Sequence, residues 1–398
     1  MRLRLSILVT LTGMSACTAT GQGPLPAPDM PPVPAAELSA RGVDPRRVRD
    51  AVARVMEGAL HDGAFPAGVA LVGTHSGILA EVSVGTLAPM AGDRRPDAVT
   101  VWDMASLTKV VALTTALMQQ VALGRIDLEA PVQRYLPGWT GPGKEQVRVR
   151  DLLTHSSGLP AWRPLYKETE TRAAALALVM DTPLEVPPGR RMVYSDLGAI
   201  ILGQIVEKTS REPFDRYVAS HIFEPLGMTS TRFLPPRDWL PRIAPTEVDP
   251  WRQRHLRGEV HDENAARLGG ISSHAGLFSS AADMSHFARM LLSGGVLDGH
   301  RIVDSATLRR FTTVQDRALS ARALGWETAS GSNSGGHRLS SRAFGHTGFT
   351  GTSLWIDPEQ DVFILLLTNR VNPTRENRKI GDVRIGLADA VIASLHGG

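Results

Sequence analysis

Ser106 and Lys109 lie three residues apart at the start of an apolar stretch, and their side chains are the first candidates for chemistry in this chain. At this spacing on a helix, a hydroxyl and an amine share one face, so Lys109 can take the proton from Ser106. The apolar run predicts a helix that ends near Gly124, and the N–H groups at its start favour a developing oxyanion. A chance surface pair would show the same spacing, but Lys109 is the only lysine with a serine at that distance.

Tyr194, Ser195 and Asp196 precede a second apolar helix, which is predicted over residues 197–208. Tyr194 can carry a proton between a nucleophile and a leaving group, and Asp196 can accept a hydrogen bond from Lys109. A helix N-cap by Ser195 or Asp196, beside a packed tyrosine, would explain the same residues without catalysis. Both interpretations stay open from these residues alone.

Gly345, His346, Thr347 and Gly348 begin a predicted C-terminal strand. Small residues at such a position allow the backbone to approach a substrate closely. His346 could orient or protonate that substrate, and the alternative is a strand entry with an exposed histidine.

Together, these three segments resemble the motifs of the serine β-lactamase and penicillin-binding-protein superfamily. Ser-x-x-Lys is followed about 90 residues later by Tyr-x-Asp and about 150 residues after that by His-Thr-Gly, in the order typical of that group. Other segments resemble the branch that holds class C β-lactamases, family VIII esterases and D-alanyl-D-alanine peptidases. They are residues 65–68, 151–160, 223–228, 258–265 and 273–278, and the whole resemblance covers roughly residues 45–395.

The resemblance implies a role for each matching residue. Ser106 would be the acylated nucleophile, Lys109 its base, and Tyr194 the residue that transfers protons and activates the deacylating water. The backbone N–H groups of Ser106 and Phe349 would form the oxyanion hole. The substrate-binding and supporting positions would be Asp196, His346, Thr347, Gly348 and Phe349.

The chain departs from the β-lactamase pattern at two positions. Asp196 stands where asparagine is commonest, and its carboxylate would favour the charged form of Lys109 and weaken it as a base, which shifts the base role towards Tyr194. His346 stands where lysine is usual, and it is a weaker fixed charge for a substrate carboxylate at neutral pH. Both departures argue against efficient β-lactam turnover.

Four further residues in the family-like segments are interpreted first as structural. His155 and His274 are expected to hold loops in place. His261 and Asp262 could line the substrate groove, and a hydrogen bond within their own loop is the favoured alternative.

The apolar patterns predict strands at both ends of the chain and helices between them. The predicted strands cover residues 67–72, 78–84, 351–356 and 362–368, and the predicted helices cover residues 44–61, 172–180, 197–208, 214–221, 282–292 and 383–395. We therefore expect an α/β (α+β) fold. Its antiparallel sheet is formed from both chain ends and flanked by helices, with an inserted all-helical region at about 125–325 of one catalytic domain, residues 38–398.

The N-terminus predicts export. A basic start, an apolar run over residues 5–13 and small residues before Cys17 resemble a bacterial signal peptide with a lipobox over residues 1–17. Cys17 would then be lipidated, with plain secretion or an uncleaved anchor as alternatives. Spanning a bilayer needs roughly 20 apolar residues, which this run lacks. Residues 18–37 are rich in proline and predict a tether between membrane and domain.

Composition narrows the classes of partner. The 398 residues carry a net charge of +3 without a basic block, so nucleic acid is not expected as a partner. Cys17 is the only cysteine, so no internal disulfide can form. No cofactor is implied, and neither a His-Glu-x-x-His metal motif nor the Gly-x-Ser-x-Gly of α/β-hydrolases is present.

These observations predict an exported serine hydrolase that forms an acyl-enzyme at Ser106 on an ester or amide. A tethered protein beside the cell wall favours a D-Ala-D-Ala-type peptidase acting on a small-molecule or peptidoglycan-derived substrate at the periplasmic face of a bacterial membrane. A carboxylesterase is the second choice and a β-lactamase the third. A penicillin-binding module without catalysis is the alternative from another class. The leaving group and the oligomeric state are not encoded in these motifs.

Overall fold

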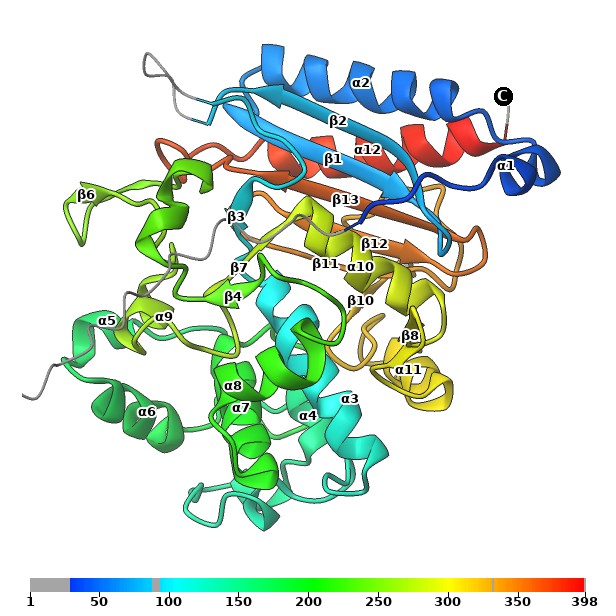
Figure 1. The fold of residues 1–398 in the computed structure, drawn as a ribbon. Helices are drawn as coiled ribbons and strands as arrows, with labels where there is room; N and C mark the ends of the chain where they lie inside the picture. Colours follow the sequence, from blue (N-terminus) through cyan, green and yellow to red (C-terminus); the bar gives the residue numbers. More distant parts are fainter. Residues whose placement is uncertain (1–28, 88–93, 331–332, 397–398) are drawn as a thin grey trace, which may run out of the picture.

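The central element is a six-stranded antiparallel sheet that both ends of the chain build (Figure 1). The computed structural model describes residues 29–87, 94–330 and 333–396. The strands follow the order β10-β11-β12-β13-β1-β2. Their bounds are β1 Ala67–Gly73, β2 Ile78–Gly85, β10 Glu327–Thr328, β11 Phe344–Thr347, β12 Ser353–Asp357 and β13 Val362–Thr368. The predicted sheet from both chain ends is confirmed, because β1 pairs directly with β13.

Helices cover both faces of this sheet (Figure 1). α2 (Pro45–His61) and α12 (Ile380–Leu395) pack together on one face, and α10 (Ala281–Leu292) packs on the other. Every residue of β13 is buried, with Leu365 on the side of α10 and Leu366 on the side of α2 and α12. A strand covered on both faces has a continuous apolar run instead of an alternating one, as β13 does.

The chain between β2 and β10 forms a mainly helical region, which contains the apolar helix predicted after Ser106. This helix begins as a π-helical segment, Lys109–Thr114, and continues as α3 (Thr115–Ala122) through the core of the molecule. The other helices of the region are α4 Val149–Leu153, α5 Leu165–Glu168, α6 Arg172–Asp181, α7 Asp196–Ser210, α8 Phe214–Val218, α9 Glu263–Arg267 and α11 Ser305–Thr312.

This region also contains short strands, so the expectation that it is all-helical is corrected. β7 (Leu277–Ser280) pairs with β3 (Val101–Asp103) and with β4 (Arg232–Phe233). Two small hairpins are formed by β5 Val248–Asp249 with β6 Arg254–His255, and by β8 Val296–Leu297 with β9 His300–Arg301. Such short strands contain too few positions for an alternating pattern to be recognised in the sequence.

The segment before β1 packs against the sheet, although the sequence predicts a tether up to residue 37. The Ile78 N–H donates to the Pro31 carbonyl at 2.8 Å, and the Val33 N–H donates to the Ile78 carbonyl at 3.2 Å. Pro34 then precedes α1 (Ala35–Arg41), where a missing N–H removes no helical hydrogen bond. The predicted end of the tether is wrong, because this segment already pairs with β2 and forms α1. The pairing is possible because β2 is an edge strand, where prolines are tolerated.

The predicted signal peptide over residues 1–17, the lipidation of Cys17 and the tether up to residue 28 lie outside the described residues. They remain predictions from the sequence. Within the described ranges, none of the helices combines the length and the apolar character needed to cross a membrane.

Leu365→Ala and Leu366→Ala test whether β13 is buried on both faces. Each change removes a fully buried side chain, and the cavity left behind should lower the free energy of unfolding by about 2–5 kcal/mol. Val248→Ala, at a side chain that is 54% exposed, should change it by less than about 0.5 kcal/mol. Urea denaturation measures all three variants, and a small effect at either leucine would contradict burial on that face.

Candidate active site

Ser106 lies in a strained turn between β3 and the π-helical segment. Ala105, directly before it, has a φ of 46°, a left-handed conformation that costs a non-glycine residue about 1–2 kcal/mol. Asp103 holds this turn, because its Oδ1 accepts the Ala105 N–H at 2.8 Å. Ser106 is partly exposed, whereas the helical residues from Lys109 onward are buried. The turn therefore presents a hydroxyl at the accessible end of a buried helix.

The ammonium of Lys109 is buried among three acceptors. Its Nζ lies 2.8 Å from Ser106 Oγ, 2.9 Å from the His274 carbonyl oxygen and 2.7 Å from Asp196 Oδ1. The contacts with Ser106 and His274 are hydrogen bonds, and the contact with Asp196 is an ion pair. Burial by itself would lower the pKa of Lys109, but the Asp196 carboxylate and the nearby Tyr194 outweigh burial and raise that pKa above its usual range. Lys109 is therefore charged at neutral pH.

Tyr194 lies against the same ammonium, with Lys109 Nζ 5.0 Å from the centre of its ring. The Tyr194 hydroxyl is buried near the Lys109 ammonium, whose pKa it helps to raise, but it meets full hydrogen-bond geometry with none of the described residues. Buried polar groups in folded proteins are nearly always paired, so this hydroxyl requires an explanation. A substrate atom or a transferred proton would supply the missing partner.

Ser195 caps α7, as one of the two sequence interpretations expects. Its Oγ accepts the Gly198 N–H at 3.3 Å and donates to the Pro160 carbonyl at 2.7 Å. Asp196 follows in the first turn of α7, where a carboxylate is favourable to the helix dipole. Because Asp196 also pairs with Lys109, capping and a role at the site coexist in this segment.

His155 clamps the backbone on both sides of Tyr194. Its Nδ1 accepts the Ser195 N–H at 3.1 Å, and its carbonyl accepts the Val193 N–H at 2.7 Å. The two rings are also in contact, with centroids 4.5 Å apart. His155 is thus a loop residue, as predicted, but the loop that it holds is the one that carries Tyr194. Burial, followed by the positive charges of Arg322 and Lys109, lowers the pKa of His155 well below its usual range.

His346 is buried on β11, so the alternative of an exposed histidine is wrong. Its Nδ1 donates to the Thr347 carbonyl at 2.8 Å, which leaves Nε2 as an acceptor without a partner among the described residues. Burial, with Arg322 and Lys109 nearby, lowers the pKa of His346 well below its usual range. His346 is therefore neutral at pH 7 and supplies no fixed positive charge.

Gly348 and Phe349 follow β11 and meet the turn that carries Ser106. A Cβ atom at Gly348 would lie 2.5 Å from the Met104 carbonyl oxygen, so glycine is needed for this close approach. Phe349 is 50% exposed, and its ring stacks on His261 with centroids 5.6 Å apart. In the described part of the chain, no acceptor is recorded for the backbone N–H of Ser106 or of Phe349. Two free donors therefore belong to segments that meet at Gly348.

Arg322 is a site residue that no sequence pattern indicated. Its guanidinium carbon lies 5.4 Å from the centre of the Tyr194 ring. Its Nε and Nη2 atoms are buried and have no partner in the described ranges, and burial lowers its pKa. A lone arginine more than 20 positions before the predicted strand offers no spacing to recognise, so only the fold brings it to Tyr194.

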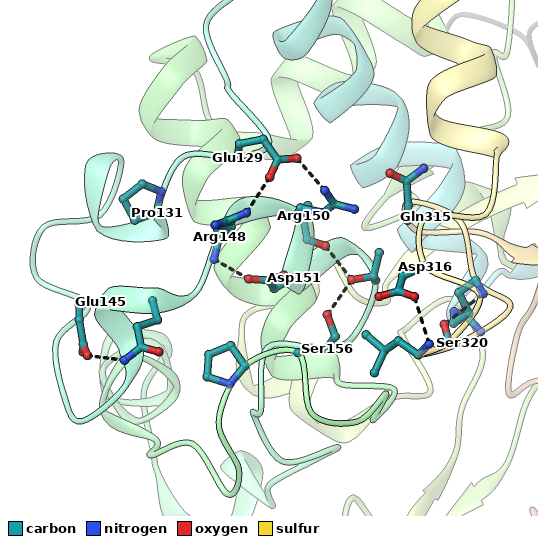
Figure 2. Close-up of a pocket in the computed structure, with 16 residues that line it drawn as sticks. Glu129, Pro131, Glu145, Arg148, Arg150, Asp151, Ser156, Gln315, Asp316 and Ser320 are labelled. Atoms are coloured by element: carbon teal, nitrogen blue, oxygen red, sulfur yellow. Dashed lines mark hydrogen bonds and ion pairs between the residues drawn. The ribbon is translucent and has the colours of Figure 1, made fainter.

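A polar cavity of about 780 Å³ adjoins this cluster (Figure 2). In its wall, Glu129 bridges Arg148 and Arg150 at 3.0 and 2.8 Å. The residues on either side of His155 line the cavity, and so does Arg322. Arg322 therefore connects the cavity with the cluster around Tyr194.

His261, Asp262 and His274 form a hydrogen-bonded edge of the site. His261 Nε2 lies 2.9 Å from Glu247, and Asp262 lies 3.0 Å from His274 Nε2 and caps α9. Asp262 thus has a structural role as a helix cap, and the side chains of both residues also bond to other segments, through Glu247 and His274. His274 does more than hold a loop, because its carbonyl is one of the three acceptors around Lys109.

Within residues 29–87, 94–330 and 333–396, two groups of side chains have the spacing of metal ligands. Asp196, Asp262 and His274 place possible ligand atoms within 4.8 Å of one another, and so do Glu37, His75 and Asp361. The first group already contains the Lys109 ammonium, and Arg41 pairs with two members of the second. A protein cation therefore balances the carboxylates in each group.

Comparisons with known proteins agree with this arrangement. A family model described as Beta-lactamase matches residues 51–388. A protein of Salmonella typhi, provisionally named D-alanyl-D-alanine carboxypeptidase, is 35% identical over 314 residues, which is 71% of this chain and 72% of the relative.

Solved structures share the fold at lower identity. A penicillin-binding protein homologue from Caulobacter crescentus has a TM-score of 0.72 at 20% identity and covers 89% of this chain and 99% of its own. EstCE1, described as a hydrolase with promiscuous acyltransferase activity, has a TM-score of 0.71 at 20% identity, with 87% and 99% covered. At these identities the likeness shows the fold.

His346→Gln tests whether this ring is neutral in the folded protein. A histidine in the unfolded chain has a pKa of about 6.5, so it binds a proton below that pH, whereas the buried His346 ring stays neutral. Acidification therefore favours unfolding. From about pH 7.5 to about pH 5.5 the free energy of unfolding should fall by about 1 kcal/mol more in the native protein than in the variant. His300→Gln, at an exposed histidine, should leave the native pH dependence unchanged. Equal pH slopes for the native protein and His346→Gln in urea denaturation would contradict this assignment.

Proposed function

The chain belongs to the beta-lactamase family of serine hydrolases, and from that premise we propose that it forms an acyl-enzyme at Ser106 as a D-alanyl-D-alanine-type carboxypeptidase. The observation that carries the proposal is the contact of 2.8 Å between Lys109 Nζ and Ser106 Oγ, next to a buried Tyr194 hydroxyl that meets full hydrogen-bond geometry with none of the described residues. A nucleophile, a cation and a proton carrier are thus within reach of one substrate atom. The name of the relative that is 35% identical supports the same substrate class.

In the proposed reaction, Tyr194 moves the proton and Lys109 stays charged. The Oγ of Ser106 attacks the carbonyl of the scissile peptide bond, its proton passes to the Tyr194 oxygen, and the Tyr194 proton passes to the leaving nitrogen. The C–N bond then breaks, D-alanine leaves as an amine, and the rest of the peptide remains as an ester on Ser106. Water attacks this ester through the same proton path. The ion pair between Lys109 and Asp196 supports this division of roles, because a paired ammonium is a poor base.

The free N–H groups of Ser106 and Phe349 would bind the oxyanion in each step. Each such donor contributes about 10²–10³-fold to the rate in well-studied acyl-transfer enzymes. No side chain is needed for this role, which agrees with the exposed position of the Phe349 ring.

Arg322 would bind the terminal carboxylate of the peptide. The Nε and Nη2 atoms of Arg322 are buried without a partner in the described ranges, and an anion would restore the interactions that they lost on leaving water. His346 is neutral and does not fill this role. The Arg322 guanidinium beside Tyr194 therefore favours a substrate with a free carboxylate over a neutral ester.

A carboxylesterase is the second candidate. Met192 lies two residues before Tyr194, and Phe349 lies two residues after Thr347. Both side chains are apolar and exposed, and they would suit a neutral acyl group. A β-lactamase is the third candidate, and the pairing of Lys109 with Asp196 counts against it.

We place the enzyme at the periplasmic face of a bacterial membrane, anchored by a lipid on Cys17. The signal-like residues 1–17 support export, and a substrate that ends in D-alanyl-D-alanine belongs to the cell wall. The net charge of +3 and the absence of a basic block in the sequence give no support for a nucleic-acid partner.

The Ser106→Ala variant, compared with the native protein on three substrates, tests the function. D-Alanine release from an N-acylated peptide ending in D-Ala-D-Ala should be the fastest reaction relative to p-nitrophenyl butyrate and penicillin hydrolysis, and the variant should lose at least about 10⁴-fold. Ser220→Ala, at an exposed helical position whose hydrogen bonds involve no site residue, serves as the control and should retain activity. Ester hydrolysis without D-alanine release would replace the proposal with the esterase, and activity that survives in Ser106→Ala would refute both.

Arg322→Gln tests carboxylate recognition. Loss of a charge-assisted hydrogen bond should lower kcat/KM for the peptide acid by about 10- to 100-fold, and hydrolysis of the same peptide with a C-terminal amide should change little. Arg150→Gln is the matched control, because Arg150 lines the same cavity but is paired with Glu129. Equal losses of kcat/KM on the peptide acid and on the peptide amide would show that Arg322 does not bind the terminal carboxylate.

A further inference from the structure

Asp103 is a buried carboxylate in which both side-chain oxygens and the backbone carbonyl are hydrogen-bonded. It ends β3 and is 2% exposed. Its Oδ1 accepts the Ala105 N–H at 2.8 Å, its Oδ2 accepts the His261 N–H at 2.6 Å, and its carbonyl accepts the Thr350 hydroxyl at 2.7 Å. Three segments distant in sequence therefore meet at one residue.

Two of these partners are direct neighbours of the proposed oxyanion donors. Ala105 precedes Ser106, and Thr350 follows Phe349. The third segment reaches Phe349 through the His261 ring, which stacks on the Phe349 ring. Every hydrogen bond of Asp103 described above thus acts on the separation or orientation of the two donors.

Other contacts hold these segments in place. Thr352 Oγ1 donates to the Met104 carbonyl at 3.1 Å, and Arg370 Nε donates to the Phe349 carbonyl at 2.8 Å. Gly348 leaves no space between them, since its Cβ would also lie 2.1 Å from Thr352 Oγ1. Asp103 is the carboxylate in this junction, and its Oδ1 accepts the N–H of Ala105, which has a left-handed conformation.

We propose that Asp103 is a positioning residue that sets the geometry of the oxyanion hole formed by Ser106 and Phe349. The inference rests on the proposed acyl-enzyme chemistry at Ser106. Asp103 does not contact the substrate in this proposal, because its side chain is buried. It acts through its hydrogen bonds with Ala105 and Thr350.

An ionised carboxylate suits this junction because it only accepts hydrogen bonds. Both of its side-chain partners are backbone N–H donors. In Asp103→Asn the amide NH₂ must face one of these donors, so either the Ala105 turn or the His261 segment is released. The first case relaxes Ser106 and the second relaxes Phe349, and both alter the distance between the two oxyanion donors.

Asp103→Asn should therefore change how the enzyme distinguishes oxygen from sulfur at the reacting carbonyl. Sulfur is larger and accepts hydrogen bonds poorly, so a well-aligned oxyanion hole favours p-nitrophenyl butyrate over its thiono analogue. The variant should lose about 10²-fold in kcat/KM on the ester, comparable to the loss of one donor. It should lose about tenfold less on the thiono ester, so the ratio of the two kcat/KM values falls about tenfold.

Asp283→Asn is the matched control. Asp283 is another fully buried carboxylate that accepts a backbone N–H, from Ser230, and a hydroxyl proton, from Thr231, and none of its recorded partners belongs to the site. Its ratio of ester to thiono-ester turnover should equal that of the native protein. Thr350→Val removes one bond to Asp103 without placing a new donor there, and it should lower the ratio in the same direction by about threefold.

The outcomes separate the inference from the proposed function. If the native protein hydrolyses the ester in a Ser106-dependent way but folded Asp103→Asn and Thr350→Val both keep the native ratio, the positioning role is refuted. If both substrates lose equally in these variants, the effect is general and the inference also fails. If the native protein shows no Ser106-dependent hydrolysis, the proposed function fails first.

Discussion

The geometry of the site depends on the buried ammonium of Lys109. A charge removed from water is tolerated only when other groups compensate it. Here the compensation comes from the Ser106 turn, from the loop that carries His274 and from the first turn of α7 with Asp196. The ammonium therefore joins three elements, and the pairing with Asp196 raises its pKa, which in the proposed mechanism leaves proton transfer to Tyr194.

The sheet supplies the other half of the site. β11 belongs to the sheet that both chain ends build and that α10 covers on one face. The segment that follows β11 contacts the turn at the end of β3. Gly348 permits the two backbones to touch. The strained φ at Ala105 is local strain of the kind stored at functional sites, and the hydrogen bond to Asp103 compensates it. The proposed nucleophile and oxyanion donors are thus positioned by backbone contacts, while Lys109, Tyr194 and Asp196 come from the helical region.

Much of this could be predicted from the sequence. The long strands and helices carry clear apolar patterns, and three motifs in the right order indicate Ser106, Lys109 and Tyr194. The short strands β4–β6 have no readable period, and the packing of Pro31 depends on an edge that only the folded sheet creates. Arg322 and Asp103 escaped prediction for a related reason: each acts through partners distant in the chain, which no local spacing records.

Acylation of Ser106 is the central claim, and the most direct measurement is the intact mass of the folded domain, residues 29–398, after exposure to penicillin, with peptide mapping of the adduct. Penicillin resembles the acyl-D-alanyl-D-alanine end of a peptide, and a peptidase that deacylates slowly should keep it. We predict a stoichiometric gain of one penicillin mass on the peptide that contains Ser106, and no gain in Ser106→Ala. An adduct on another residue, or an equal gain in Ser106→Ala, would contradict the account.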